Sequence, residues 1–118
     1  MAEPYLAQLN EILDEIGGPP NPGVILEARH FFSGAALYAN QKICASLSPA
    51  GLALKLPEDQ RNRLCEEEQA TEFRFFPSGP VKREYALISE KLVKNPTQLK
   101  DLLAVCVRYV LGLPDPNS

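Results

Sequence analysis

The alternation of side chains between residues 24 and 56 limits the possible folds of this chain more than any other feature. A period of two places alternate residues on the same face of a β-strand. Turn-forming residues at Asn40-Gln41 and at 48–51 divide the stretch, so it predicts antiparallel strands joined by short connections. Apolar residues occupy every second position in three runs: Val24, Leu26 and Ala28; Ile43, Ala45 and Leu47; and Leu52, Leu54 and Leu56.

The first of these strands is predicted to be long and bent. Its extended pattern begins at Val24, is interrupted at Ser33-Gly34 and continues to Ala39. Small residues inside a strand pattern indicate a bulge or a bend in the strand. The two strands that follow are expected at residues 42–47 and 52–56.

Two amphipathic helices are predicted near the ends of the chain. The first follows Pro4 and stops at the Gly-Gly-Pro-Pro run that begins at Gly17. The second has Asn95 as its cap and Pro96 in its first turn, and it ends at Gly112. Their apolar stripes, at three- and four-residue steps, are Leu6, Leu9, Ile12, Leu13 and Ile16 in the first helix, and Leu99, Leu102, Leu103, Cys106, Val107 and Val110 in the second.

The middle of the chain predicts a short charged helix over residues 57–68 and a second pair of strands, at 73–76 and 85–88. The predicted order of elements is therefore α-β-β-β-α-β-β-α. This order indicates an α+β fold, with one five-stranded antiparallel sheet and the N- and C-terminal helices packed on one of its faces.

The length of 118 residues fits a single domain over residues 1–118, with a core within residues 5–112. The N-terminus lacks the basic start of a signal peptide. No apolar run reaches the roughly 18–20 residues that a membrane span requires. We therefore expect a cytoplasmic protein with no membrane partner.

The three cysteines show no metal-binding or redox spacing. Cys44 and Cys106 are expected in the core as free thiols, whereas Cys65 lies among charged residues and is expected to be partly exposed. We therefore expect the chain to fold without a metal ion or a disulfide.

The charge balance argues against nucleic acid as the sole partner. The formal net charge is −3 and the sequence pI is near 5.2. Non-specific nucleic-acid binding requires a dense cationic face that displaces counterions. This composition still allows a local basic patch, so it excludes nucleic-acid binding only as the main activity of the chain.

No set of residues indicates a catalytic or cofactor site. His30 is the only histidine, and no nucleophile or orienting acid stands at a recognisable spacing from it. The run Glu66–Glu68 does not form a turn motif for a hard metal ion, because adjacent helix residues diverge. Gly17-Gly18 lacks the spacing of a phosphate-binding loop. We therefore expect no enzyme activity, no metal and no cofactor.

The order of these elements and several short motifs resemble the N-terminal domain of the TfoX/Sxy competence regulators. The resemblance covers residues 5–112 and rests on five segments in a shared order: 29–34 (Arg-His-Phe-Phe-Ser-Gly) before 36–38 (Ala-Leu-Tyr), 52–55 (Leu-Ala-Leu-Lys), 73–76 with Tyr85, and Asn95-Pro96 with Leu99. Two features depart from the family. Ser33 and Ala36 replace glycines, and no C-terminal helical domain follows, so we expect a stand-alone domain.

The resemblance implies a non-enzymatic regulatory or interaction module that acts by contact with another protein. Sheet edges are natural sites for strand addition, so a homodimer is a further expectation. The aromatic and basic residues near the second strand pair predict an interaction surface made of Phe73, Phe76, Lys82 and Arg83. The alternative is a small-ligand-binding protein or a small enzyme with a cleft near His30 and the Ser33-Gly34 bend.

Overall fold

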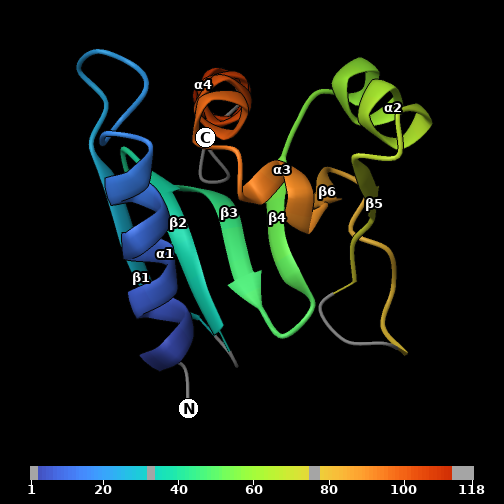
Figure 1. Cartoon of the computed structure of the whole chain (residues 1–118), viewed down its shortest axis with the longest axis horizontal. Coiled ribbons are helices and arrows are strands. Elements are labelled where there is room, and N and C mark those ends of the chain that lie inside the picture. The colour runs from blue at the N-terminus through green and yellow to red at the C-terminus, as the bar shows by residue number, and fades with distance from the viewer. Residues whose placement is uncertain (1–2, 32–33, 75–77, 113–118) are drawn as a thin grey trace.

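The fold is α+β, with one antiparallel sheet of six strands in the order β1-β2-β3-β4-β6-β5 (Figure 1). The computed structural model describes residues 3–31, 34–74 and 78–112. The elements, in chain order, are α1 (Glu3–Glu15), β1 (Leu26–Phe31), β2 (Gly34–Ala39), β3 (Lys42–Ser48), β4 (Gly51–Lys55), α2 (Glu58–Glu66), β5 (Ala70–Glu72), β6 (Tyr85–Ile88), α3 (Glu90–Val93) and α4 (Pro96–Leu111).

The prediction of one long bent strand over residues 24–39 is wrong, because this segment forms two strands. β1 and β2 pair with each other, with Leu26 opposite Ala39 and Phe31 opposite Gly34. The sheet therefore has six strands where the sequence predicted five. Gly34 is the first residue of β2, and Ser33 lies outside the described residues. Small residues fit a bend within one strand as well as a turn between two strands, so the sequence alone does not show that the chain reverses between the two halves.

The turn between β2 and β3 follows the sequence prediction. Asn40 and Gln41 have φ angles of 46° and 76°, in the left-handed region. Two left-handed residues make the tight turn whose twist matches that of a hairpin, and asparagine tolerates this conformation. Gly51 also has a positive φ, of 126°, where β4 leaves the turn after β3.

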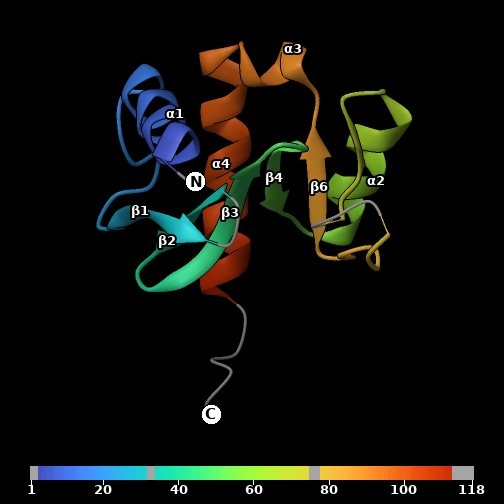
Figure 2. The ribbon, with the colours of Figure 1, turned by 90° about the horizontal axis from the view of Figure 1, so that it is seen from below.

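The two long helices pack on one face of the sheet, as predicted. α1 contacts β1, β2 and β3, and α4 contacts β2, β3 and β4. Figure 2 shows both helices on the same side of these strands. Buried side chains of both helices, among them Leu9 and Leu103, belong to one core cluster with Leu37 of β2 and Leu54 of β4. This cluster contains most of the buried apolar residues among those described, and their burial stabilises the fold.

The second strand pair differs in position from the prediction. β5 ends at Glu72, so Phe73 follows the strand, whereas Phe75 and Phe76 lie outside the described residues. A further short helix, α3, follows β6. The side-chain oxygen of Ser89 accepts a hydrogen bond from the main-chain amide of Leu92 at 3.3 Å and caps this helix.

The cysteines lie where the sequence predicts. Cys44 and Cys106 are buried, Cys65 is exposed, and all three are free thiols. The thiol of Cys106 donates a hydrogen bond to the main-chain oxygen of Cys44, at 3.1 Å, and thereby links α4 to β3. Within the described ranges, no helix has both the length and the apolar character that crossing a membrane demands.

Gly34 is expected to resist substitution because of a close contact and not because of its backbone angles. A Cβ atom at this position would overlap the carbonyl oxygen of Leu47 on β3, which is main chain and cannot rotate away. We expect Gly34→Ala to lower the free energy of unfolding by about 1–3 kcal/mol, as for other overpacked positions.

The measurement is a urea titration of both proteins. Gly112→Ala is the matched control, since a Cβ there would meet the carbonyl oxygen of Arg108 at an ordinary 3.4 Å. We expect this control to change stability by less than about 0.5 kcal/mol. Equal stability of the two variants would contradict the close contact at Gly34.

Candidate functional site

The predicted interaction surface is only partly exposed. Phe73 is 0% exposed, so its side chain lies in the interior and not at a contact surface. Lys82 is half-buried, and its main-chain amide donates a hydrogen bond to the carbonyl oxygen of Phe73 at 2.8 Å. Arg83 is exposed, and Phe76 lies outside the described residues. Of the three described residues, Arg83 is therefore the one fully available to a partner.

Phe73 belongs to a small cluster on the sheet face that the helices leave uncovered. Its ring lies 5.6 Å from the ring of Tyr85, tilted by 49°. Ala53 of β4 completes the buried part of the cluster, and Leu87 packs beside it. The ammonium of Lys55 lies 5.6 Å from the Tyr85 ring, in cation–π range. The aromatic residues near β5 and β6 thus form a second, smaller core.

A groove of about 690 Å³ runs between α2 and the β5–β6 strand pair, and Arg83 is one of its lining residues. Arg61 of α2 is a second basic residue in its wall, and the buried Nε atom of this side chain has no hydrogen-bond partner among the described residues. The groove also holds apolar and acidic groups: its other lining residues are Glu58, Asn62, Cys65, Ala70, Thr71, Glu72, Val81, Tyr85 and Ala86. Such a mixed lining can contact both the main chain and the side chains of a protein segment.

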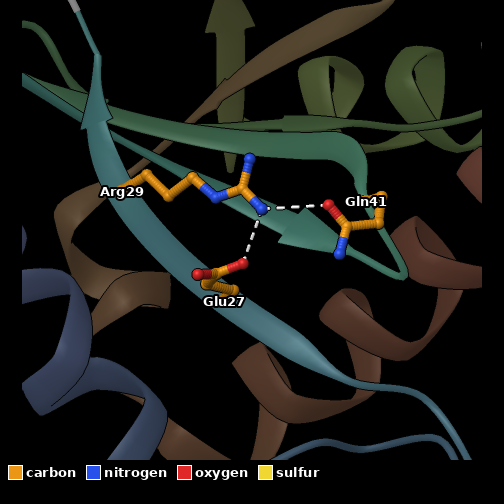
Figure 3. Close-up of polar contacts among 3 residues, drawn as sticks. All are labelled: Glu27, Arg29 and Gln41. Atoms are coloured by element: carbon orange, nitrogen blue, oxygen red, sulfur yellow. Dashed lines mark hydrogen bonds and ion pairs between the residues drawn. The ribbon is translucent and has the colours of Figure 1, made fainter.

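A second polar cluster, which the sequence analysis missed, lies on β1 at the edge of the sheet (Figure 3). One nitrogen of Arg29, Nη2, donates to Oε1 of Glu27 at 2.6 Å and to Oε1 of Gln41 at 3.0 Å. The guanidinium lies 4.5 Å from the centre of the Tyr38 ring. The hydrogen bond to Glu27 raises the pKa of Arg29. The sequence signal for this cluster is the pair of opposite charges at Glu27 and Arg29, which are two residues apart and therefore lie on one face of a strand.

His30 lies on β1 opposite Ala35, and its side chain is exposed. The residues that line the groove between α2 and the β5–β6 pair come from other parts of the chain. The alternative of a ligand-binding or catalytic cleft near His30 and Ser33-Gly34 stays a prediction, and Ser33 lies outside the described residues. Among the residues that the structure describes, no three His, Cys, Asp or Glu side chains gather as a metal site would require.

Two buried acidic groups are held in their neutral forms. Burial, followed by the hydrogen bond with Cys44, raises the pKa of Cys106 well above its ordinary value. Burial likewise raises the pKa of Tyr85. A group whose pKa is higher in the folded than in the unfolded state stabilises the fold below the unfolded pKa, and this contribution is lost as the pH rises above that value.

We therefore expect the free energy of unfolding to fall with rising pH, starting near pH 8.5, where an unfolded thiol ionises. Each such group contributes a slope of about 1.4 kcal/mol per pH unit once its unfolded form is ionised and its folded form is not. Urea titrations between pH 7 and 10 measure the slope, and Cys106→Ala is expected to reduce it. A pH-independent stability over this range would contradict the neutral burial of Cys106.

The fold and the two surfaces define a small α+β domain with an edge cluster on β1 and a mixed groove beside α2. The sequence matches the TfoX N-terminal domain over residues 24–109. Because the match spans most of the 118 residues, the chain belongs to the TfoX N-terminal domain family. A search of curated proteins found no match.

Proposed function

We propose that this chain is a non-enzymatic regulatory module that acts by contact with another protein. The observation that carries this proposal is its membership of the TfoX N-terminal domain family, which the sequence resemblance links to competence regulators. The mixed groove between α2 and the β5–β6 pair supports a protein ligand, since its wall combines charged, polar and apolar side chains.

Within this groove we assign the contact to its basic side chains. Arg83 is exposed, and Arg61 holds a buried Nε that lacks an acceptor among the described residues. A carboxylate or carbonyl oxygen of a bound protein segment would supply such an acceptor, and an unpaired buried donor costs roughly 1–3 kcal/mol. Arginine is also enriched among the residues that dominate binding energy. The favoured ligand is therefore a protein segment that presents oxygen acceptors.

Affinity capture from the native cell with paired charge reversals tests this proposal. Arg83→Glu changes the groove, and Arg63→Glu is the matched control, since Arg63 is also exposed but lines a different groove with α4 residues. We expect the wild type and Arg63→Glu to capture the same protein and Arg83→Glu to lose it. Circular dichroism must show that both variants are folded.

Two results would count against the proposal. Capture that Arg83→Glu leaves intact would remove the groove as the contact surface. A chemical turnover that disappears in a folded His30→Ala variant would overturn the non-enzymatic assignment and support the cleft near His30. Under the proposal, His30→Ala leaves partner capture unchanged, because His30 lies on β1 and not in the groove.

A further inference from the structure

The two edges of the sheet differ in how well they are protected. β5, at one edge, is only three residues long, and each edge strand contacts one helix, β5 with α2 and β1 with α1. β1, at the other edge, is six residues long and contains no proline, lysine or bulge. Charged side chains also help to block an edge, and β1 carries two, Glu27 and Arg29, which are paired with each other. None of the six residues of β1 is buried. No strand of the described residues pairs with the outer side of β1, so this edge is available for the addition of another strand.

The hydrogen-bond pattern shows which groups face this edge. The main-chain amide of Asn40 donates to the carbonyl oxygen of Ile25 at 2.9 Å. Bonded and non-bonded pairs alternate along an antiparallel ladder. The odd-numbered residues of β1 therefore bond to β2, and the even-numbered residues direct their main-chain N–H and C=O groups toward the open edge. A strand added there must pair with the even-numbered residues.

One large apolar residue next to this edge is exposed. Ile25 immediately precedes β1 and is 73% exposed, the one such large side chain among the described residues. It lies on the same face as Glu27 and Arg29, and a hollow of about 260 Å³ is lined by Ile25, Glu27, Asn40 and Gln41. Burying the Ile25 side chain against another chain would remove apolar surface from water, and this would favour association.

We propose that β1 pairs with β1 of a second copy of this chain, antiparallel and with Ala28 on the two-fold axis. With this axis, even-numbered residues of one copy form hydrogen-bonded pairs with even-numbered residues of the other. The main-chain groups that face the open edge require such pairs. The resulting cross-strand pairs are Ile25 with Phe31, Leu26 with His30, Glu27 with Arg29, and Ala28 with its own copy.

Charge complementarity selects this register among those that the hydrogen bonds allow. With Ala28 on the axis, Glu27 of each copy lies opposite Arg29 of the other, and the apolar Ile25 lies opposite Phe31. A shift of the axis by one residue places either Glu27 opposite its own copy or Arg29 opposite its own copy. Like charges directly opposite each other destabilise a sheet, whereas opposite charges stabilise it.

The pairing uses side chains that are already arranged on the right face. Glu27 and Arg29 point to the same side of the sheet, where Figure 3 shows Arg29 bonded to both Glu27 and Gln41. The dimer would bring together two carboxylates and two guanidinium groups, and the charges of these four groups sum to zero. The self-pairing involves β1 alone, so it goes beyond the proposed groove contact and does not depend on it.

The test is the solution mass of the protein, measured by sedimentation equilibrium over a concentration series. The chain has a mass of 13.0 kDa, and we expect the wild type to reach twice this value at high concentration. Arg29→Glu places a second carboxylate opposite Glu27, and Glu27→Arg places a second guanidinium opposite Arg29. We expect each single variant to raise the dimer Kd about tenfold or more.

Combinations of these variants identify the register. In an equimolar mixture of Arg29→Glu and Glu27→Arg, opposite charges again face each other, so we expect a heterodimer. The double variant Glu27→Arg/Arg29→Glu should recover the homodimer for the same reason. Arg108→Glu, on the exposed side of α4, is the matched control and should leave the dimer Kd unchanged.

Ala28→Pro provides an independent variant that keeps the charges. Proline removes the amide of Ala28, which points to the open edge and is not part of the β1–β2 ladder, so an edge strand tolerates it. We expect a folded monomer, with its circular dichroism preserved. A wild type that stays monomeric, or a dimer that survives both Arg29→Glu and Ala28→Pro, would overturn the proposal, as would failure of the mixed variants to associate.

Discussion

Phe73→Ala is expected to lower the free energy of unfolding by about 3–5 kcal/mol, the cost of truncating a fully buried phenylalanine. The side chain is 0% exposed and packs against Tyr85 on the face of the sheet opposite the two long helices. Its main chain also accepts the hydrogen bond from Lys82 that closes the connection between β5 and β6. The truncation removes the largest fully buried side chain of the second core cluster.

Urea titrations of the wild type and the variant measure this loss. Phe73→Leu is the matched control, because it keeps an apolar side chain and is expected to cost clearly less than the alanine variant. A change below about 1 kcal/mol in Phe73→Ala would contradict the interior position of Phe73. It would instead favour an exposed role for this residue in the interaction surface that the sequence suggested.

Phe73 also shows what the sequence could not predict about the candidate site. Alternation at residues 73–76 predicted a strand, and the nearby basic residues predicted a contact surface. The structure ends β5 at Glu72 and packs the side chain of Phe73 against Ala53 and Tyr85. This burial depends on contacts with β4 and β6, which no local pattern records. Arg83 remains exposed, because the neighbouring groove leaves it accessible.

The helices were predictable because their signals are local. The apolar stripe of α4 repeats at helical spacing, and Asn95 caps it by accepting a hydrogen bond from the amide of Gln98 at 3.2 Å. The short helix α3 was missed although it has a cap at Ser89, since four residues are too few to show a period. Length therefore decided which helices the sequence revealed.

The β1–β2 hairpin was missed for a different reason. The small residues between the two strands fit a bend as well as a turn. The requirement for glycine at position 34 comes from Leu47, which lies on a different strand. The Arg29 cluster was missed for a related reason, because Gln41 reaches Arg29 only after the chain has formed β2 and turned toward β3. Both features depend on pairing between strands, which a single sequence specifies only weakly.

Leu103→Ala is expected to cost about 2–5 kcal/mol, because Leu103 is buried in the main core where α4 packs on the sheet. Both the lost transfer free energy and the cavity left under α4 contribute to this cost. Arg108→Ala, at an exposed position of the same helix, is the control and should change stability by less than about 0.5 kcal/mol. Equal urea midpoints for the two variants would mean that α4 presents another face to the sheet. The shared cluster of α1, α4 and the central strands would then no longer be the main source of stability.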